Sequence, residues 1–197
     1  MYLLLIVVSL VYASPAWSDQ FTEHCVAAAV ERTQHTVRYD GAYVPIAYPN
    51  GDIPATMGVC TDVIIRAYRS LGVDLQQLVH EDIAQNFERY PSRRIWGLHK
   101  PDKNIDHRRV PNLQAFFKRH GVELPVTQLA ESYRAGDLVT WMLPGNLPHI
   151  GIVTDQTSSL TGLPLIVHNI GQGPELEDML FRYKVTGHYR YAPATYR

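Results

Sequence analysis

The stretch that decides the fold is residues 136–153, which read GDLVTWMLPGNLPHIGIV. It holds two short runs rich in β-branched and other apolar residues, 137–141 and 149–153, separated by a loop that contains proline and glycine. Similar runs follow at 165–168 and 181–191. Short runs of this kind between Gly and Pro turns predict β-strands. We therefore expect the C-terminal third of the chain to form a mainly antiparallel sheet.

The residues before this region follow a different, helical pattern. A helix is predicted over 20–36, and a second begins at Cys60-Thr61-Asp62, because Thr and Asp suit a first turn and apolar residues then recur at helical spacing. A third is expected over 111–120, between a proline at its start and Gly121 after its end. Between them, 37–54 is predicted to be extended segments joined by turns, and 82–109 a long loop. Helices first and strands second indicate an α+β domain.

The composition limits the class of protein. The chain has 197 residues and 46% hydrophobic content, which suits one domain with a real core. Its 18 basic and 19 acidic side chains leave a net charge of −1, so we expect neither nucleic acid nor an anionic membrane surface as a partner. Its two cysteines are too few for a disulfide framework. We expect a monomer.

The first 18 residues carry no Lys, Arg, Asp or Glu. Their apolar run, 2–13, is shorter than the roughly 20 residues that span a bilayer. Small residues at Ala16 and Ser18 suit a signal-peptidase site, although no basic residue follows Met1. We expect 1–18 to be a signal peptide, the mature domain to comprise 19–197 without a membrane span, and the protein to be exported, most simply to a periplasm.

Three residues have the chemistry of a thiol enzyme. Cys60 stands at a predicted helix start, where the helix dipole favours a thiolate. His149 begins one predicted strand and His168 ends another, and neighbouring antiparallel strands can bring such positions together. A thiol nucleophile needs a base, and the base needs a group that orients it. These residues supply those parts in the order nucleophile, base and orienting group.

The segments around these residues carry a family resemblance. The pattern GDLV and then HIGIV, after a helix-starting cysteine, resembles papain-like cell-wall peptidases of the NlpC and CHAP type. The match is closer to a bacterial family of unknown function, DUF1287, through GVCTD (58–62), PDKNIDHRRVPNL (101–113), GDLVTW (136–141), PHIGIV (148–153) and HNIG (168–171). The resemblance covers roughly residues 30–192. It implies a papain-like fold in which Cys60 is the nucleophile, His149 the general base and acid, and His168 its orienting group.

The same resemblance suggests substrate contacts. A tyrosine upstream of the cysteine helps to polarise the attacked carbonyl in NlpC-type enzymes, and Tyr48 is the candidate for this role. The chemistry of the residues adds a second candidate contact. The stretch 99–109 is either a solvated loop or a substrate-recognition loop, and in the second case Arg108 and Arg109 are the candidates for binding the carboxylates of peptidoglycan stem peptides, since Arg binds carboxylates bidentately. Asp62 places negative charge near the thiol, and we expect Arg66, one turn further along, to offset it. No compact metal-ligand spacing is present, so we expect neither a metal nor a cofactor.

These features predict an exported thiol amidohydrolase that cleaves amide bonds in peptidoglycan or its peptide fragments through a Cys-His-His triad and a thioester. Two alternatives remain open at this point. A Cys25–Cys60 disulfide would remove the nucleophile and favour a non-catalytic envelope-binding module. A thiol acyltransferase would use the same residues with an acceptor other than water.

Overall fold

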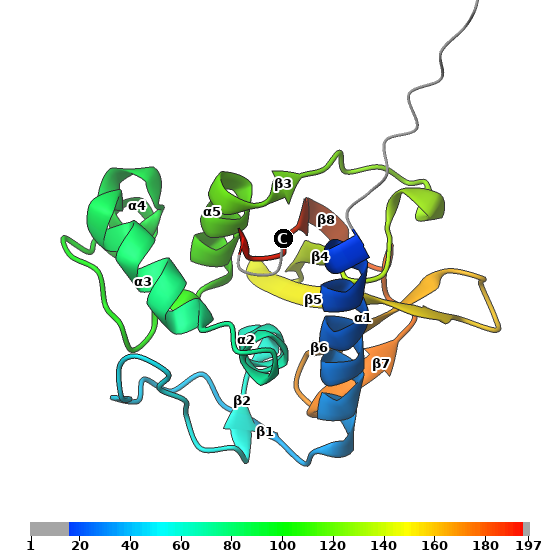
Figure 1. Ribbon diagram of the computed structural model, residues 1–197, viewed down its shortest axis with the longest axis horizontal. Coiled ribbons are helices and arrows are strands. Elements are labelled where there is room, and N and C mark those ends of the chain that lie inside the picture. Colours follow the sequence, from blue (N-terminus) through cyan, green and yellow to red (C-terminus); the bar gives the residue numbers. More distant parts are fainter. Residues whose placement is uncertain (1–15, 195–197) are drawn as a thin grey trace, which may run out of the picture.

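A six-stranded antiparallel sheet forms the centre of the molecule (Figure 1). The computed structural model describes residues 16–194. The strands lie in the spatial order β3-β8-β4-β5-β6-β7, and every neighbouring pair is antiparallel. Their bounds are β3 Val122–Glu123, β4 Leu138–Leu143, β5 Leu147–Thr157, β6 Pro164–Asn169, β7 Pro174–Glu177 and β8 Lys184–Arg190.

The helices lie beside this sheet, and α3 and α4 are farthest from β7 (Figure 1). Helices α1 and α2 pack on each other and against β5, and α5 packs against β8. The α-helices are α1 Ala16–Glu31, α2 Cys60–Ser70, α3 Leu75–Gln85, α4 Ser92–Trp96 and α5 Val110–His120. Single 3₁₀ turns span Arg32–Gln34, Phe87–Arg89, Asp106–Arg108 and Ala130–Ser132, and a short parallel pair joins β1 (Arg38–Tyr39) to β2 (Met57–Gly58).

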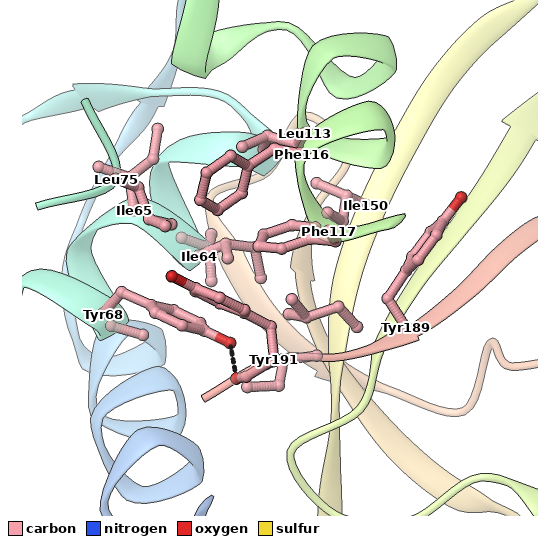
Figure 2. Packing of buried hydrophobic residues seen from close by; sticks show 14 of the residues in the cluster. Ile64, Ile65, Tyr68, Leu75, Leu113, Phe116, Phe117, Ile150, Tyr189 and Tyr191 are labelled. Atoms are coloured by element: carbon pink, nitrogen blue, oxygen red, sulfur yellow. Dashed lines mark hydrogen bonds between the residues drawn. The ribbon is translucent and has the colours of Figure 1, made fainter. Parts of the chain in front are cut away.

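The main core fills the space between the helices and one face of the sheet (Figure 2). Ile64 of α2 and Leu113 of α5 are fully buried there against Ile150 of β5. Full burial of side chains of this size stabilises the fold by about 1.5–3 kcal/mol each. Tyr68 anchors the C-terminal segment, since its hydroxyl donates to the carbonyl of Tyr191 over 2.8 Å.

A second, smaller core covers the opposite face of the sheet. Trp141 of β4 is fully buried in it, and its indole Nε1 donates to the carbonyl of Leu180 over 2.9 Å. Val153 and Ile166 complete this face from β5 and β6. Because both faces of β4 and β5 are covered, their sequences read as nearly continuous apolar runs rather than as a simple alternation.

The α+β class and the antiparallel sheet are confirmed, with some differences in the elements. The helix that begins at Cys60 forms as predicted, and the helix expected over 111–120 begins one residue earlier, at Val110. The helix expected over 20–36 spans Ala16–Glu31 and is followed by a 3₁₀ turn. The prediction of a long loop over 82–109 is wrong at its start, because α3 continues to Gln85, and short helical turns occupy much of the remainder. Strand β7 was also not expected.

The sequence already contained the signal for α3. Leu75, Val79 and Ile83 are spaced by four residues and are all fully buried. Asp74 caps this helix by accepting from the amide of Gln76 over 2.9 Å. A buried stripe after a capping residue is typical of an amphipathic helix.

The expected signal peptide, residues 1–18, falls mostly outside the described residues, and the expected cleavage point after Ser18 lies within α1. Among residues 16–194, none of the helices is both long enough and apolar enough to cross a bilayer.

Candidate functional site

Cys60 is the first residue of α2, and its thiol is buried with 4% of the residue exposed. The carboxylate of Asp62 caps the N-terminus of α2 by accepting a hydrogen bond from the amide of Val59 over 2.7 Å. Burial raises the pKa of the Cys60 thiol to about 12, while hydrogen bonds from the backbone amides of Ile150, Thr61 and Cys60 itself act in the opposite direction. These amides are donors gathered around the sulfur, as a helix N-terminus provides.

Helix α2, which begins at Cys60, packs against β5. The amide of Ile150 is among the groups that lower the pKa of the Cys60 thiol, so the peptide unit between His149 and Ile150 lies near the cysteine. The side chain of Ile150 faces the helices. His149 lies beside Trp141, its partner in β4, with 6.0 Å between ring centroids. Helix α2 and the start of β5 thus place Cys60 near the backbone of His149, while the His149 side chain lies on the same face of the sheet as Trp141.

His149 and His168 are joined by a direct hydrogen bond. Nε2 of His149 lies 3.0 Å from Nδ1 of His168, and the two rings are nearly perpendicular. The other nitrogen of His168, Nε2, lies 3.0 Å from Oε2 of Glu177 in β7. The two histidines predicted from the sequence therefore begin a longer series of hydrogen-bonded side chains, which crosses three adjacent strands from β5 through β6 to β7.

Gly151 leaves the space in which the side chains of His149 and His168 meet. A Cβ at this position would lie 2.6 Å from Cγ2 of Ile166 and 3.2 Å from Cβ of His168. Only a residue without a side chain lets β5 and β6 approach this closely on the histidine face. The glycine of the HIGIV segment therefore serves the packing that places His168 against His149.

Burial makes both histidines poor proton acceptors in the free protein. It lowers the pKa of His149 to about 3, and the neighbouring His168 lowers it further. Burial also lowers the pKa of His168, against the opposing effect of the Glu177 carboxylate. At neutral pH the resting site therefore holds a neutral thiol and neutral imidazoles rather than a preformed ion pair.

Arg108 neutralises Asp62 in a buried, two-pronged ion pair. Nε and Nη2 of Arg108 lie 2.9 Å and 3.0 Å from the two carboxylate oxygens of Asp62, and each side chain is only 3% exposed. The same guanidinium donates to the carbonyls of Asp40 and Ala42, each over 3.3 Å. It therefore ties the helix that carries Cys60 to the segment that follows β1.

This geometry corrects two expectations from the sequence. Arg66 does not compensate Asp62, because it pairs with Asp52, with 3.0 Å between Nε and Oδ2. Arg108 was expected to contact substrate, but its guanidinium is instead engaged inside the protein. Sequence spacing favoured Arg66 because it lies one turn along the same helix, whereas the actual partner is 46 residues away in the chain.

Comparison with known proteins shows the family to which this chain belongs. The family model described as "Domain of unknown function (DUF1287)" matches residues 26–191. The chain belongs to the DUF1287 family. It is also 53% identical over 156 residues to "Uncharacterized protein YijF" of Escherichia coli (strain K12), an alignment that covers 79% of this chain and 75% of that protein. The DUF1287 match includes the cysteine, both histidines and Glu177, whereas Cys25 lies just before it.

Two further predicted contact residues in this DUF1287 chain lie in other surroundings. The hydroxyl of Tyr48 lies 3.4 Å from Oε1 of Glu81, and its ring meets the edge of His80, so it packs on α3. Arg109 is held by Asp106 over 3.0 Å and stacks on Trp96, with 4.3 Å from its guanidinium carbon to the ring centroid.

Tyr39 is a tyrosine near Cys60. It pairs with Gly58 in the short parallel sheet, two residues before the cysteine. Burial, with the nearby Cys60 and Asp62, raises the pKa of its hydroxyl to about 12. The residue is still 43% exposed, so its ring reaches the surface. Sequence reasoning missed Tyr39 because nothing in the local pattern predicted a strand pair between 38–39 and 57–58.

Both cysteines of this DUF1287 chain are buried free thiols, so the Cys25–Cys60 disulfide required by the binding-module alternative is not formed. Burial raises the pKa of Cys25 to about 12, and no other cause contributes to that shift. Cys25 thus behaves as a core residue of α1. In the described part of the chain, no three or more His, Cys, Asp or Glu side chains converge as a metal site would require.

Proposed function

We propose that this DUF1287 protein is an exported thiol amidohydrolase of papain-like fold that cleaves amide bonds in peptidoglycan stem peptides. The observation that carries the proposal is the hydrogen-bonded His149–His168 pair, which lies on the two strands that helix α2 packs against, with Cys60 as the first residue of that helix. A nucleophile, a base and a group orienting that base are what covalent amide hydrolysis requires. The resemblance to NlpC and CHAP peptidases and the signal-like N-terminus support the reaction class and the location.

The first chemical step moves a proton within the site. With Nε2 of His149 engaged by His168, Nδ1 is the nitrogen left to accept the Cys60 proton. The sulfur attacks the substrate carbonyl as this proton leaves, which forms a C–S bond and an oxyanion. Because the resting thiol and imidazole are both neutral, this transfer accompanies attack on the bound substrate instead of preceding it. Backbone amides at the start of α2 are the candidate donors to the oxyanion.

The second stage releases the products. The tetrahedral intermediate collapses, the C–N bond breaks, and His149 gives its proton to the leaving amine. Water then attacks the thioester as His149 takes its proton, and the thiol leaves with that proton restored. In this scheme Tyr39 is the candidate for the role expected of Tyr48, because it pairs with Gly58, two residues before Cys60, and its hydroxyl is subject to the charge of Cys60.

The test is digestion of purified muropeptides by the wild-type protein, Cys60→Ala and Cys25→Ala. We expect wild type and Cys25→Ala to yield products with a new amine and a mass gain of one water, and Cys60→Ala to yield none. Cys25→Ala is the matched control, because it removes the other buried thiol of the chain. Equal product from wild type and Cys60→Ala would remove Cys60 from the mechanism.

A further inference from the structure

Glu177 is the last residue of the hydrogen-bonded series His149–His168–Glu177, and a carboxylate accepts hydrogen bonds and does not donate them. His168, which it contacts over 3.0 Å, is fully buried, and the Glu177 side chain is 35% exposed. Glu177 therefore connects a buried imidazole pair to the edge of the sheet. The hydrogen bond between His168 and Glu177 requires a proton on Nε2 of His168, because the carboxylate of Glu177 can only accept a hydrogen bond.

The position of the proton on His168 then determines the position of the proton on His149. A neutral His168 with its proton on Nε2 presents an unprotonated Nδ1, so Nε2 of His149 must donate to it. A neutral His149 with its proton on Nε2 has a free lone pair on Nδ1. The opposite arrangement would put a proton on Nδ1 of each ring and would leave Nε2 of His168 facing Glu177 without a proton.

We propose that Glu177 is a positioning residue that sets the tautomers of both histidines and thereby makes Nδ1 of His149 the proton acceptor. The effect of Glu177 on catalysis rests on the proposed function, whereas its effect on the histidine tautomers does not depend on that function. When His149 takes the thiol proton, the negative charge of Glu177 also lies two hydrogen bonds away and opposes the new positive charge. The carboxylate thus acts on the base through His168 without touching substrate.

Strand β7 supplies a matched control. Glu175 is the register partner of His168, lies two residues from Glu177 on the same strand and carries the same charge. Both ring nitrogens of His168 already have other partners, His149 and Glu177. Glu175→Ala therefore removes an equal charge from the same strand without removing a partner of the ring.

The first experiment measures the tautomers by NMR of protein with ¹⁵N-labelled histidine, with His149→Gln and His168→Gln used to assign the rings. In wild type we expect both rings to carry the proton on Nε2. In Glu177→Ala we expect a fraction of both rings to move the proton to Nδ1, while Glu175→Ala keeps the wild-type signals. We expect Glu177→Gln, whose amide oxygen can still accept, to restore the wild-type tautomers. Unchanged tautomers in Glu177→Ala, or a proton on Nδ1 of His149 in wild type, would overturn the proposal.

The second experiment separates this inference from the proposed function. In muropeptide hydrolysis we expect Glu177→Ala to lower kcat at least tenfold with KM nearly unchanged, up to the roughly 10⁴-fold loss seen when a triad base is held in the wrong tautomer. Tautomers that change in a protein without amidase activity would support the role of Glu177 and contradict the proposed function. Tautomers that stay fixed in an active enzyme would contradict the role of Glu177 alone.

Discussion

Replacing Arg108 by Met should destabilise the protein far more than an ordinary loss of a surface charge. The substitution keeps a long apolar stem but removes both donors to Asp62, at 2.9 Å and 3.0 Å, in a pair whose side chains are each 3% exposed. Asp62 then remains buried without its cation. Breaking a buried pair in this way costs about 3–5 kcal/mol of unfolding free energy.

Arg93→Met is the matched control, because its partner Glu88 and Arg93 itself are 70% and 55% exposed in a pair of 2.8 Å. An exposed pair of this kind contributes about 0–1 kcal/mol. Urea unfolding followed by tryptophan fluorescence measures both variants against wild type. A loss in Arg108→Met no greater than that in Arg93→Met would refute the assignment of Arg108 as a structural residue.

Three further outcomes follow from other parts of the fold. Gly151→Ala should cost about 1–3 kcal/mol in urea unfolding, because its Cβ would lie 2.6 Å from Ile166; Gly41→Ala, whose Cβ meets its neighbour at 3.8 Å, should cost less, and equal losses would contradict the close approach of β5 and β6. Tyr68→Phe should lower the free energy of unfolding by about 0.5–1.5 kcal/mol, since it removes the hydrogen bond from the Tyr68 hydroxyl to the Tyr191 carbonyl; an unchanged melting temperature would contradict this. Burial lowers the pKa of His107 from 6.5 to about 3, so between these pH values only the unfolded chain binds the proton and stability falls as pH falls. His107→Gln should make that pH dependence shallower by at most about 1.4 kcal/mol per pH unit in unfolding series at several pH values, and identical slopes would contradict the assignment.

The elements that sequence reasoning predicted well are those with strong local signals. The strands around residues 136–153 form because their apolar runs end at Gly and Pro turns, and α5 has Pro111 in its first turn and ends before Gly121. Strand β7 was missed because it is an edge strand of four residues, although its alternation of Glu and Leu after a Gly-rich turn was a usable signal.

In the candidate site, too, local sequence signals predicted some residues and not others. Cys60, His149 and His168 could be predicted from their residue types and from their positions at the ends of helices and strands. The partners that complete the site come from elsewhere in the chain: Arg108 is 46 residues from Asp62, and Glu177 lies in the unpredicted strand. Ion pairs between such distant segments depend on how the loops pack, and spacing along one helix pointed to Arg66 instead. Tertiary contacts, rather than local sequence propensity, therefore determine which charged side chains form ion pairs.

The most direct test of the central claim is to trap the acyl-enzyme. Wild-type protein turning over a muropeptide is quenched in acid, and its peptides are mapped by mass spectrometry. We expect an adduct equal in mass to the acyl half of the cleaved substrate, located on the peptide that contains Cys60 and released by hydroxylamine. Cleavage without any such adduct, together with undiminished turnover by Cys60→Ala, would contradict the proposed thioester mechanism.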